Sequence, residues 1–123
     1  MAKILVVDDE ESIRSFVQRA LTMDGHIVMT AQDGAEALDV LVENGFDLLL
    51  SDIRMPLMDG VALALSAGRD YPDMMILLMT GFADQRERTA DLETLIHDVV
   101  TKPFSLAQIR DAVDGALKAR KAA

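Results

Sequence analysis

The chain has 123 residues, half of them hydrophobic, which suits one compact domain with a single core. Twelve basic against 21 acidic residues give a net charge of −9, so we expect no direct binding to nucleic acid. The lack of cysteine excludes disulfides and thiolate metal sites; with no expected signal peptide or membrane helix, the predicted location is cytoplasmic.

Short apolar runs and segments with helical spacing alternate five times along the chain. We predict strands at Ile4–Val7, Ile27–Thr30, Phe46–Ser51, Met74–Thr80 and Val99–Thr101. Each strand is followed by a predicted helix: one with apolar residues from Ile13 to Leu21, one over Ala35–Val42, one from Val61 that ends before Tyr71, one from Asp84 through Ile96, and a last one capped by Ser105 with its apolar stripe ending at Leu117. A loop at Asp52–Gly60 separates the third strand from its helix. The segment Lys118–Ala123 is predicted to be a loose tail.

The first, third and fourth predicted strands are continuous aliphatic runs. Strands of this kind are typical of a parallel sheet that has helices on both faces. The sequence therefore predicts an α/β sandwich. We expect one domain over residues 1–123 with no output domain.

Three acidic residues lie at predicted strand ends. In the strand order 2-1-3-4-5, a ligand site forms where the order reverses, between the first and third strands. Asp8 and Asp9 follow the first strand and Asp52 follows the third. Their carboxylates would repel one another unless a hard divalent cation such as Mg²⁺ joined them. The alternatives are that Asp9 or Glu10 caps the first helix and that Asp52 is a turn residue.

Thr80 and Lys102 end the fourth and fifth predicted strands, at the same edge as the acids. A lysine about 4 Å from a carboxylate gains roughly 4 kcal/mol at an effective dielectric constant near 20, before desolvation. Lys102 could thus hold a carboxylate and later a phosphate, and its bond to Pro103 is a candidate cis peptide. Asp59, which precedes a glycine, is interpreted as a turn residue.

Four motifs occur in order: ILVVDDE, LLLSDIRMPLMDG, LLMTG and TKPF. Together they resemble the receiver (CheY-like) domains of response regulators over nearly the whole chain. The resemblance implies a flavodoxin-like (βα)5 three-layer sandwich with the parallel sheet order 2-1-3-4-5. It also implies an Mg²⁺ cofactor and a phosphoryl donor that is a histidine kinase or a phosphotransfer protein. No enzymatic activity is expected beyond self-catalysed phosphoryl transfer and autodephosphorylation.

The same resemblance implies a role for each site residue. The expected roles are phosphoacceptor for Asp52, direct Mg²⁺ ligands for Asp9, Asp52 and the backbone carbonyl of Arg54, a water-mediated contact for Asp8, a hydroxyl donor to the phosphoryl group for Thr80, and a phosphoryl-oxygen partner for Lys102. Phosphorylation would then change a surface formed by the last two helices and the fifth strand, and a downstream protein would bind there.

Val99 departs from the family pattern, which places an aromatic residue three positions before the conserved lysine. In the family, the aromatic side chain swings inward when the conserved threonine moves, and the shorter valine cannot make the same movement. Phe82 could replace that ring, or it could be a loop residue that faces solvent, and both interpretations stay open.

A narrower resemblance concerns the segments LLMTGFADQRER and IHDVVTKPFSL. They are similar to the CpdR type of stand-alone receiver, which acts as an adaptor for the ClpXP protease. The terminal Ala122-Ala123 is similar to a tail that this protease reads.

Three other functions are disfavoured. A phosphohydrolase of the haloacid dehalogenase type places a second aspartate two residues after its nucleophile, where this chain has Arg54. A flavin-binding electron carrier needs aromatic walls, but the chain has no tryptophan and one tyrosine. A receiver that works unphosphorylated would not need Asp9, Asp52, Thr80 and Lys102 together.

Overall fold

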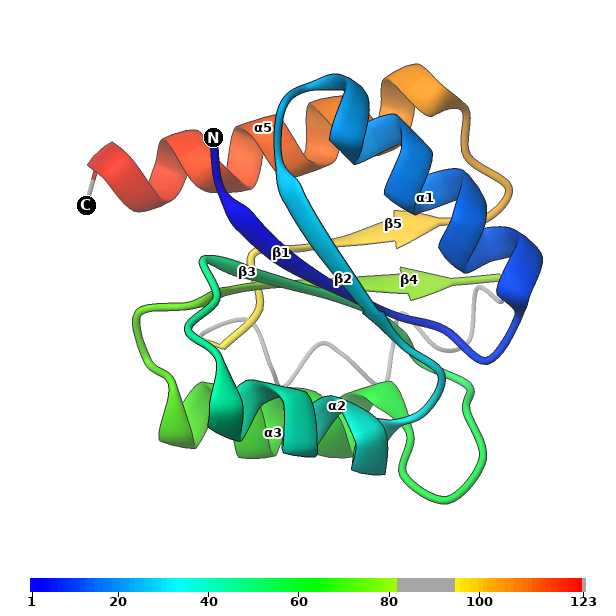
Figure 1. Cartoon of the computed structure of the whole chain (residues 1–123), viewed down its shortest axis with the longest axis vertical. Helices are drawn as coiled ribbons and strands as arrows, with labels where there is room; N and C mark the ends of the chain where they lie inside the picture. The colour runs from blue at the N-terminus through cyan, green and yellow to red at the C-terminus, as the bar shows by residue number, and fades with distance from the viewer. Residues whose placement is uncertain (82–94, 123) are drawn as a thin grey trace.

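The computed structural model describes residues 1–81 and 95–122 and contains a five-stranded parallel sheet in the order β2-β1-β3-β4-β5 (Figure 1). Its elements are β1 (Lys3–Val7), α1 (Glu11–Met23), β2 (Ile27–Ala31), α2 (Gly34–Glu43), β3 (Leu48–Asp52), α3 (Gly60–Asp70), β4 (Met75–Thr80), β5 (Asp98–Thr101) and α5 (Leu106–Ala122). The predicted flavodoxin-like sandwich and its strand order are confirmed. The helix predicted from Asp84 through Ile96 falls almost wholly on residues outside the described part, and so does Phe82.

Two apolar cores lie on opposite faces of the sheet, because successive side chains of a strand point to opposite sides. Ile4 and Val6 of β1 pack with α1 and α5, whereas Leu5 and Val7 pack with α2 and α3. Figure 1 shows these helix pairs on either side of the sheet. All five residues of β3 are buried, which explains why the central strands are continuous apolar runs.

Local polar contacts set several helix ends. The Asp59 side chain accepts a hydrogen bond from the Ala62 amide at 2.9 Å and so caps α3. Ser105 Oγ accepts from the Gln108 amide at 3.0 Å, while Gln108 Oε1 accepts from the Ser105 amide at 2.7 Å. This reciprocal pair is a capping box and confirms the predicted start of the last helix. Gly25, at φ 84°, follows the end of α1, where a left-handed conformation favours glycine.

The prediction of a loose tail from Lys118 is wrong, because α5 continues to Ala122. Arg120 explains the extension. Its Nε donates to the backbone carbonyl of Asp73 at 2.9 Å, and its Nη1 forms an ion pair with Asp47. These contacts attach the last turns of α5 to the loops that precede β3 and β4.

Within the described ranges, no helix combines the length and the apolar character needed to cross a membrane.

Candidate functional site

Three carboxylates meet at the carboxyl edge of the sheet. Asp8 and Asp9 follow β1, Asp52 is the last residue of β3, and the two strands pair directly, with Val7 opposite Ser51. One oxygen atom from each acid lies within 4.8 Å of the others. Asp8 is fully buried and Asp52 is 6% exposed, whereas Asp9 is exposed. The predicted convergence of these acids is therefore confirmed.

The alternative local roles of these acids are wrong. The residue that precedes α1 is Glu10, and its side chain makes no capping hydrogen bond. Instead, the Glu10 amide donates to Asp8 Oδ1 at 2.9 Å. Asp9 caps nothing, and Asp52 belongs to a buried strand rather than to a turn.

Lys102 forms ion pairs with both buried acids. Its Nζ lies 2.9 Å from Asp8 Oδ2 and 3.2 Å from Asp52 Oδ1. Burial opposes the charge of this lysine, but hydrogen bonding to Asp8 and attraction from both carboxylates outweigh burial and raise its pKa. The Lys102–Pro103 bond is cis, as predicted.

The carboxylates of Asp8, Asp9 and Asp52 carry more negative charge than Lys102 alone can balance. Burial, followed by repulsion from Asp8, raises the pKa of Asp52 to about 6, although Lys102 acts in the opposite direction. A hard cation with oxygen ligands would relieve this repulsion, and Mg²⁺ typically takes one or two carboxylates and keeps several waters. Two buried carboxylates beside an exposed third one fit that donor set.

The end of β4 and the loop that follows β3 lie beside the acids at the carboxyl edge of the sheet. Met79 of β4 lies opposite Asp52, and the next residue, Thr80, is fully buried at the end of the strand. After β3 the chain enters a loop in which Arg54 is exposed. Arg54 and Asp9, with Met55 and Asp59, line an open cavity of about 410 Å³ beside the acids.

Gly60 lets this loop fold back against Asp52. Its amide donates to the Ile53 carbonyl at 2.8 Å, and a Cβ at this position would lie 2.1 Å from the Asp52 backbone oxygen. Any side chain here would displace the backbone of the strand end that carries Asp52.

Val99 lies in β5 opposite Leu78 and packs, half-buried, against the core on the α2–α3 face. The alternative that Phe82 replaces the family's aromatic residue falls outside the described residues.

Sequence reasoning missed two contacts at this edge. One is the ion pair between Lys102 and Asp8, which is shorter than the contact between Lys102 and Asp52. The other is Arg14 of α1, whose Nη1 donates to the Asp8 backbone oxygen at 2.6 Å. A basic residue one helical turn beyond an acid pair was the available signal.

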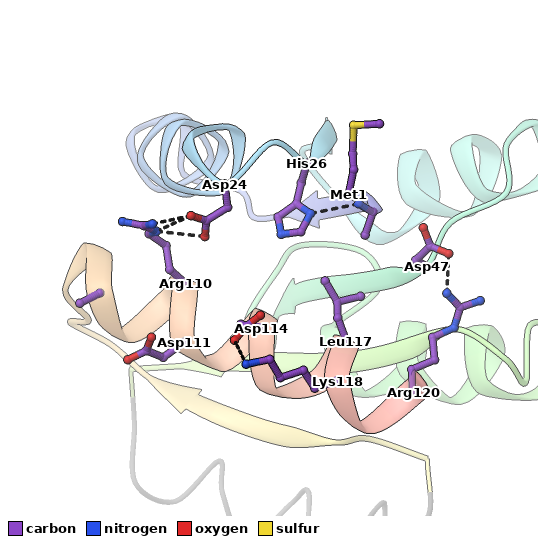
Figure 2. Close-up of a pocket in the computed structure, with 12 residues that line it drawn as sticks. Met1, Asp24, His26, Asp47, Arg110, Asp111, Asp114, Leu117, Lys118 and Arg120 are labelled. Atoms are coloured by element: carbon purple, nitrogen blue, oxygen red, sulfur yellow. Dashed lines mark hydrogen bonds and ion pairs between the residues drawn. The ribbon is translucent and has the colours of Figure 1, made fainter. Parts of the chain in front are cut away.

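A larger cavity, of about 850 Å³, lies at the opposite edge of the sheet, between the N-terminus and α5 (Figure 2). Figure 2 shows three of the four aspartates that line it in ion pairs, namely Asp24 with Arg110, Asp47 with Arg120 and Asp114 with Lys118. Each of these three acids has a basic partner of its own, whereas Asp8 and Asp52 at the carboxyl edge share Lys102 and repel one another. The candidate site is therefore the carboxyl edge.

The acid cluster lies at the topological switch point of a doubly wound parallel sheet, which is where ligand sites of this class of α/β domain form. Residues 4–114 match the family model described as the response regulator receiver domain, and the chain belongs to that family. It is a receiver domain of two-component systems.

Relatives and solved structures agree with this family. The chain is 36% identical over 116 residues to a probable transcriptional regulator, ycf27, of Guillardia theta, covering 94% of this chain and 45% of that protein. It is 36% identical over 107 residues to the response regulator MprA of Mycobacterium sp. (strain KMS), covering 87% and 46%. The chain thus spans about half the length of the curated relatives it matches.

Two solved structures are similar over nearly their whole length. A CheY-like receiver domain protein from Methanospirillum hungatei JF-1 superposes with a TM-score of 0.91 at 26% identity, covering 98% of this chain and 97% of that one. The response regulator TrrA from Thermotoga maritima, in complex with Mg²⁺ and BeF, superposes with a TM-score of 0.87 at 31% identity, covering 95% and 100%.

Proposed function

We propose that this chain is a phosphorylation switch in which Asp52 accepts a phosphoryl group from a histidine kinase or a phosphotransfer protein. The observation that carries the proposal is the convergence of Asp8, Asp9 and Asp52 beside Lys102 at the carboxyl edge of the sheet. Family membership supports it, since receiver domains serve two-component systems.

Mg²⁺ is the proposed cofactor. Asp9 and Asp52 would hold it directly, with the backbone carbonyl of Arg54, and Asp8 would act through a bound water. When bound, the ion supplies positive charge beside the oxygens of the transferring group. The acid cluster supports this assignment, as does the Mg²⁺-BeF complex of TrrA.

The protein's own side chains account for the rest of the chemistry. An Asp52 carboxylate oxygen attacks the phosphorus, the bond to the donor's imidazole nitrogen breaks, and an acyl phosphate forms. Lys102 Nζ already lies 3.2 Å from Asp52 Oδ1, and it would form an ion pair with a phosphoryl oxygen as negative charge develops there. The buried Thr80 would donate its hydroxyl to the product, which carries about two negative charges. The resulting bias between two surface conformations is the signal, and water later removes the phosphate.

Phosphorylation of the purified chain tests this proposal. With acetyl phosphate and Mg²⁺, we expect one phosphoryl group per chain, visible as a mass increase that hydroxylamine removes. Asp52→Ala is expected to lose the label completely, whereas Asp39→Ala, which alters an exposed aspartate of α2, should label like the wild type. Equal labelling of Asp52→Ala would refute the assignment of the phosphoacceptor.

The cytoplasmic location and the output are further parts of the proposal. A protein target would bind the surface that includes β5 and α5. The similarity of the segments LLMTGFADQRER and IHDVVTKPFSL to CpdR-type receivers supports the ClpXP protease as that target. Degradation of a reporter substrate by ClpXP should then differ between the unphosphorylated chain and the chain treated with beryllofluoride. Identical rates would remove this output from the proposal.

A further inference from the structure

The backbone between Asp8 and Asp9 is held by an arginine of α1. Arg14 Nη1 donates a hydrogen bond of 2.6 Å to the Asp8 carbonyl oxygen. That oxygen belongs to the peptide group that joins the two acids. Because a peptide group is planar, holding its oxygen also restrains the Asp9 Cα, from which the Asp9 side chain extends.

Asp9 depends on this restraint more than Asp8 does. The Asp8 carboxylate is held by the Glu10 amide at 2.9 Å and by Lys102 at 2.9 Å. The Asp9 carboxylate is exposed and makes no hydrogen bond or ion pair with any residue that the structure describes. No contact with these residues holds the Asp9 side chain, so its placement depends more on the backbone than that of Asp8 does.

The local helix start adds little to the restraint. The residue before α1, Glu10, makes no side-chain cap, so the turn from β1 into α1 depends on contacts to Asp8. These are the Asp8 amide to the Ala31 carbonyl at 3.2 Å, the Glu10 amide to Asp8 Oδ1, and Arg14 to the Asp8 carbonyl. Only the last of these involves the peptide group that leads directly into Asp9.

We propose that Arg14 is a positioning residue of the divalent-cation site: by holding the Asp8 carbonyl it directs Asp9 toward the ion and strengthens Mg²⁺ binding. This inference depends on the proposed function, because it requires that Asp9 binds Mg²⁺. The positive charge of Arg14 acts in the opposite direction by repelling the ion. Partners that orient metal ligands typically change metal affinity 10- to 100-fold, and we expect this effect to exceed the repulsion.

Titration calorimetry of the unphosphorylated chain with Mg²⁺ tests the inference without using phosphoryl transfer. Arg14→Met removes both charge and donor, and we expect Mg²⁺ binding to weaken about tenfold. Arg14→Gln and Arg14→Lys keep a donor and should recover part of that loss. Arg19→Met, an exposed arginine of the same helix, makes the same change in net charge and should stay within about twofold of the wild type. Unchanged or tighter binding by Arg14→Met would overturn the inference.

A double-substitution cycle shows whether the effect passes through Asp9. In an Asp9→Asn background, Arg14→Met should change Mg²⁺ affinity by less than about twofold, because the ligand it directs is gone. The same tenfold loss in both backgrounds would contradict the positioning role. Amide hydrogen exchange at Asp9, measured without Mg²⁺, should be faster in Arg14→Met than in Arg19→Met. If the wild type itself binds no Mg²⁺, the proposed metal site fails, which differs from a wild type that binds and an Arg14→Met variant that binds equally well.

Discussion

Asp52→Asn is expected to stabilise the protein in the absence of metal, although it removes the phosphoacceptor. Burial and repulsion from Asp8 raise the pKa of Asp52 from 3.8 to about 6. A shift of this size corresponds to about 3 kcal/mol at roughly 1.4 kcal/mol per pKa unit, so we expect the variant to gain about 2–3 kcal/mol near pH 7.5. Urea unfolding in EDTA would measure the gain.

The stability difference between Asp52→Asn and the wild type should depend on pH. Between pH 4 and 6 the folded wild type keeps a proton on Asp52 that the unfolded chain releases. Wild-type stability therefore falls as the pH rises through this window, and the contribution from Asp52 is absent in Asp52→Asn. The two proteins should differ least near pH 4 and most above pH 6.5. Asp39→Asn, a change at an exposed position of α2, is the control and should shift stability by less than about 0.5 kcal/mol at any pH.

Saturating Mg²⁺ provides a second check, because the cation would lower the cost of ionising Asp52. The advantage of Asp52→Asn at pH 7.5 should then shrink. A variant less stable than the wild type, or an advantage that is the same at pH 4 and pH 7.5, would show that repulsion within the cluster is not the dominant effect.

Lys102→Met should have the opposite effect on stability. Lys102 is the partner of the fully buried Asp8 and contacts Asp52 as well. Removing one member of a buried ion pair typically costs 3–5 kcal/mol, because the other charge stays buried without compensation. We expect a loss of that size in urea unfolding at pH 7.5 without metal. Lys118→Met is the control, since its ion pair with Asp114 is exposed and should contribute little to stability.

The same variant should phosphorylate slowly. Loss of a positive charge aimed at the transferring group typically costs 10²- to 10³-fold in rate. The rate with acetyl phosphate should be measured at a temperature where circular dichroism shows Lys102→Met to be folded, so that lost chemistry is separated from lost structure. Asp52→Asn should gain more stability in the Lys102→Met background than in the wild type, because Lys102 no longer offsets the Asp52 charge. Equal gains in the two backgrounds would mean that these two side chains do not interact.

The alternating apolar pattern carried most of the fold prediction. Strands buried on both faces must be apolar throughout, and the runs that became β1, β3 and β4 showed this directly. The placement of Asp52, Thr80 and Lys102 at one edge followed, because parallel strands all end on the same side. The error at the C-terminus has a tertiary cause: Arg120 binds groups that precede β3 and β4, and nothing in the local composition of the tail indicates those partners.

The distinction between Asp8 and Asp9 shows the limit of reasoning from sequence alone. The two are chemically identical neighbours, and their spacing places both at the edge without showing which one is buried. Packing decides this, because Asp8 turns inward to Lys102 and to the Glu10 amide, whereas Asp9 faces the open side of the cluster. Sequence by itself determined which residue types gather at this edge, since residue types and strand ends are local properties. Only the tertiary structure decided which charges compensate one another, because Asp8 and Lys102 are 94 residues apart and meet only when the sheet is assembled.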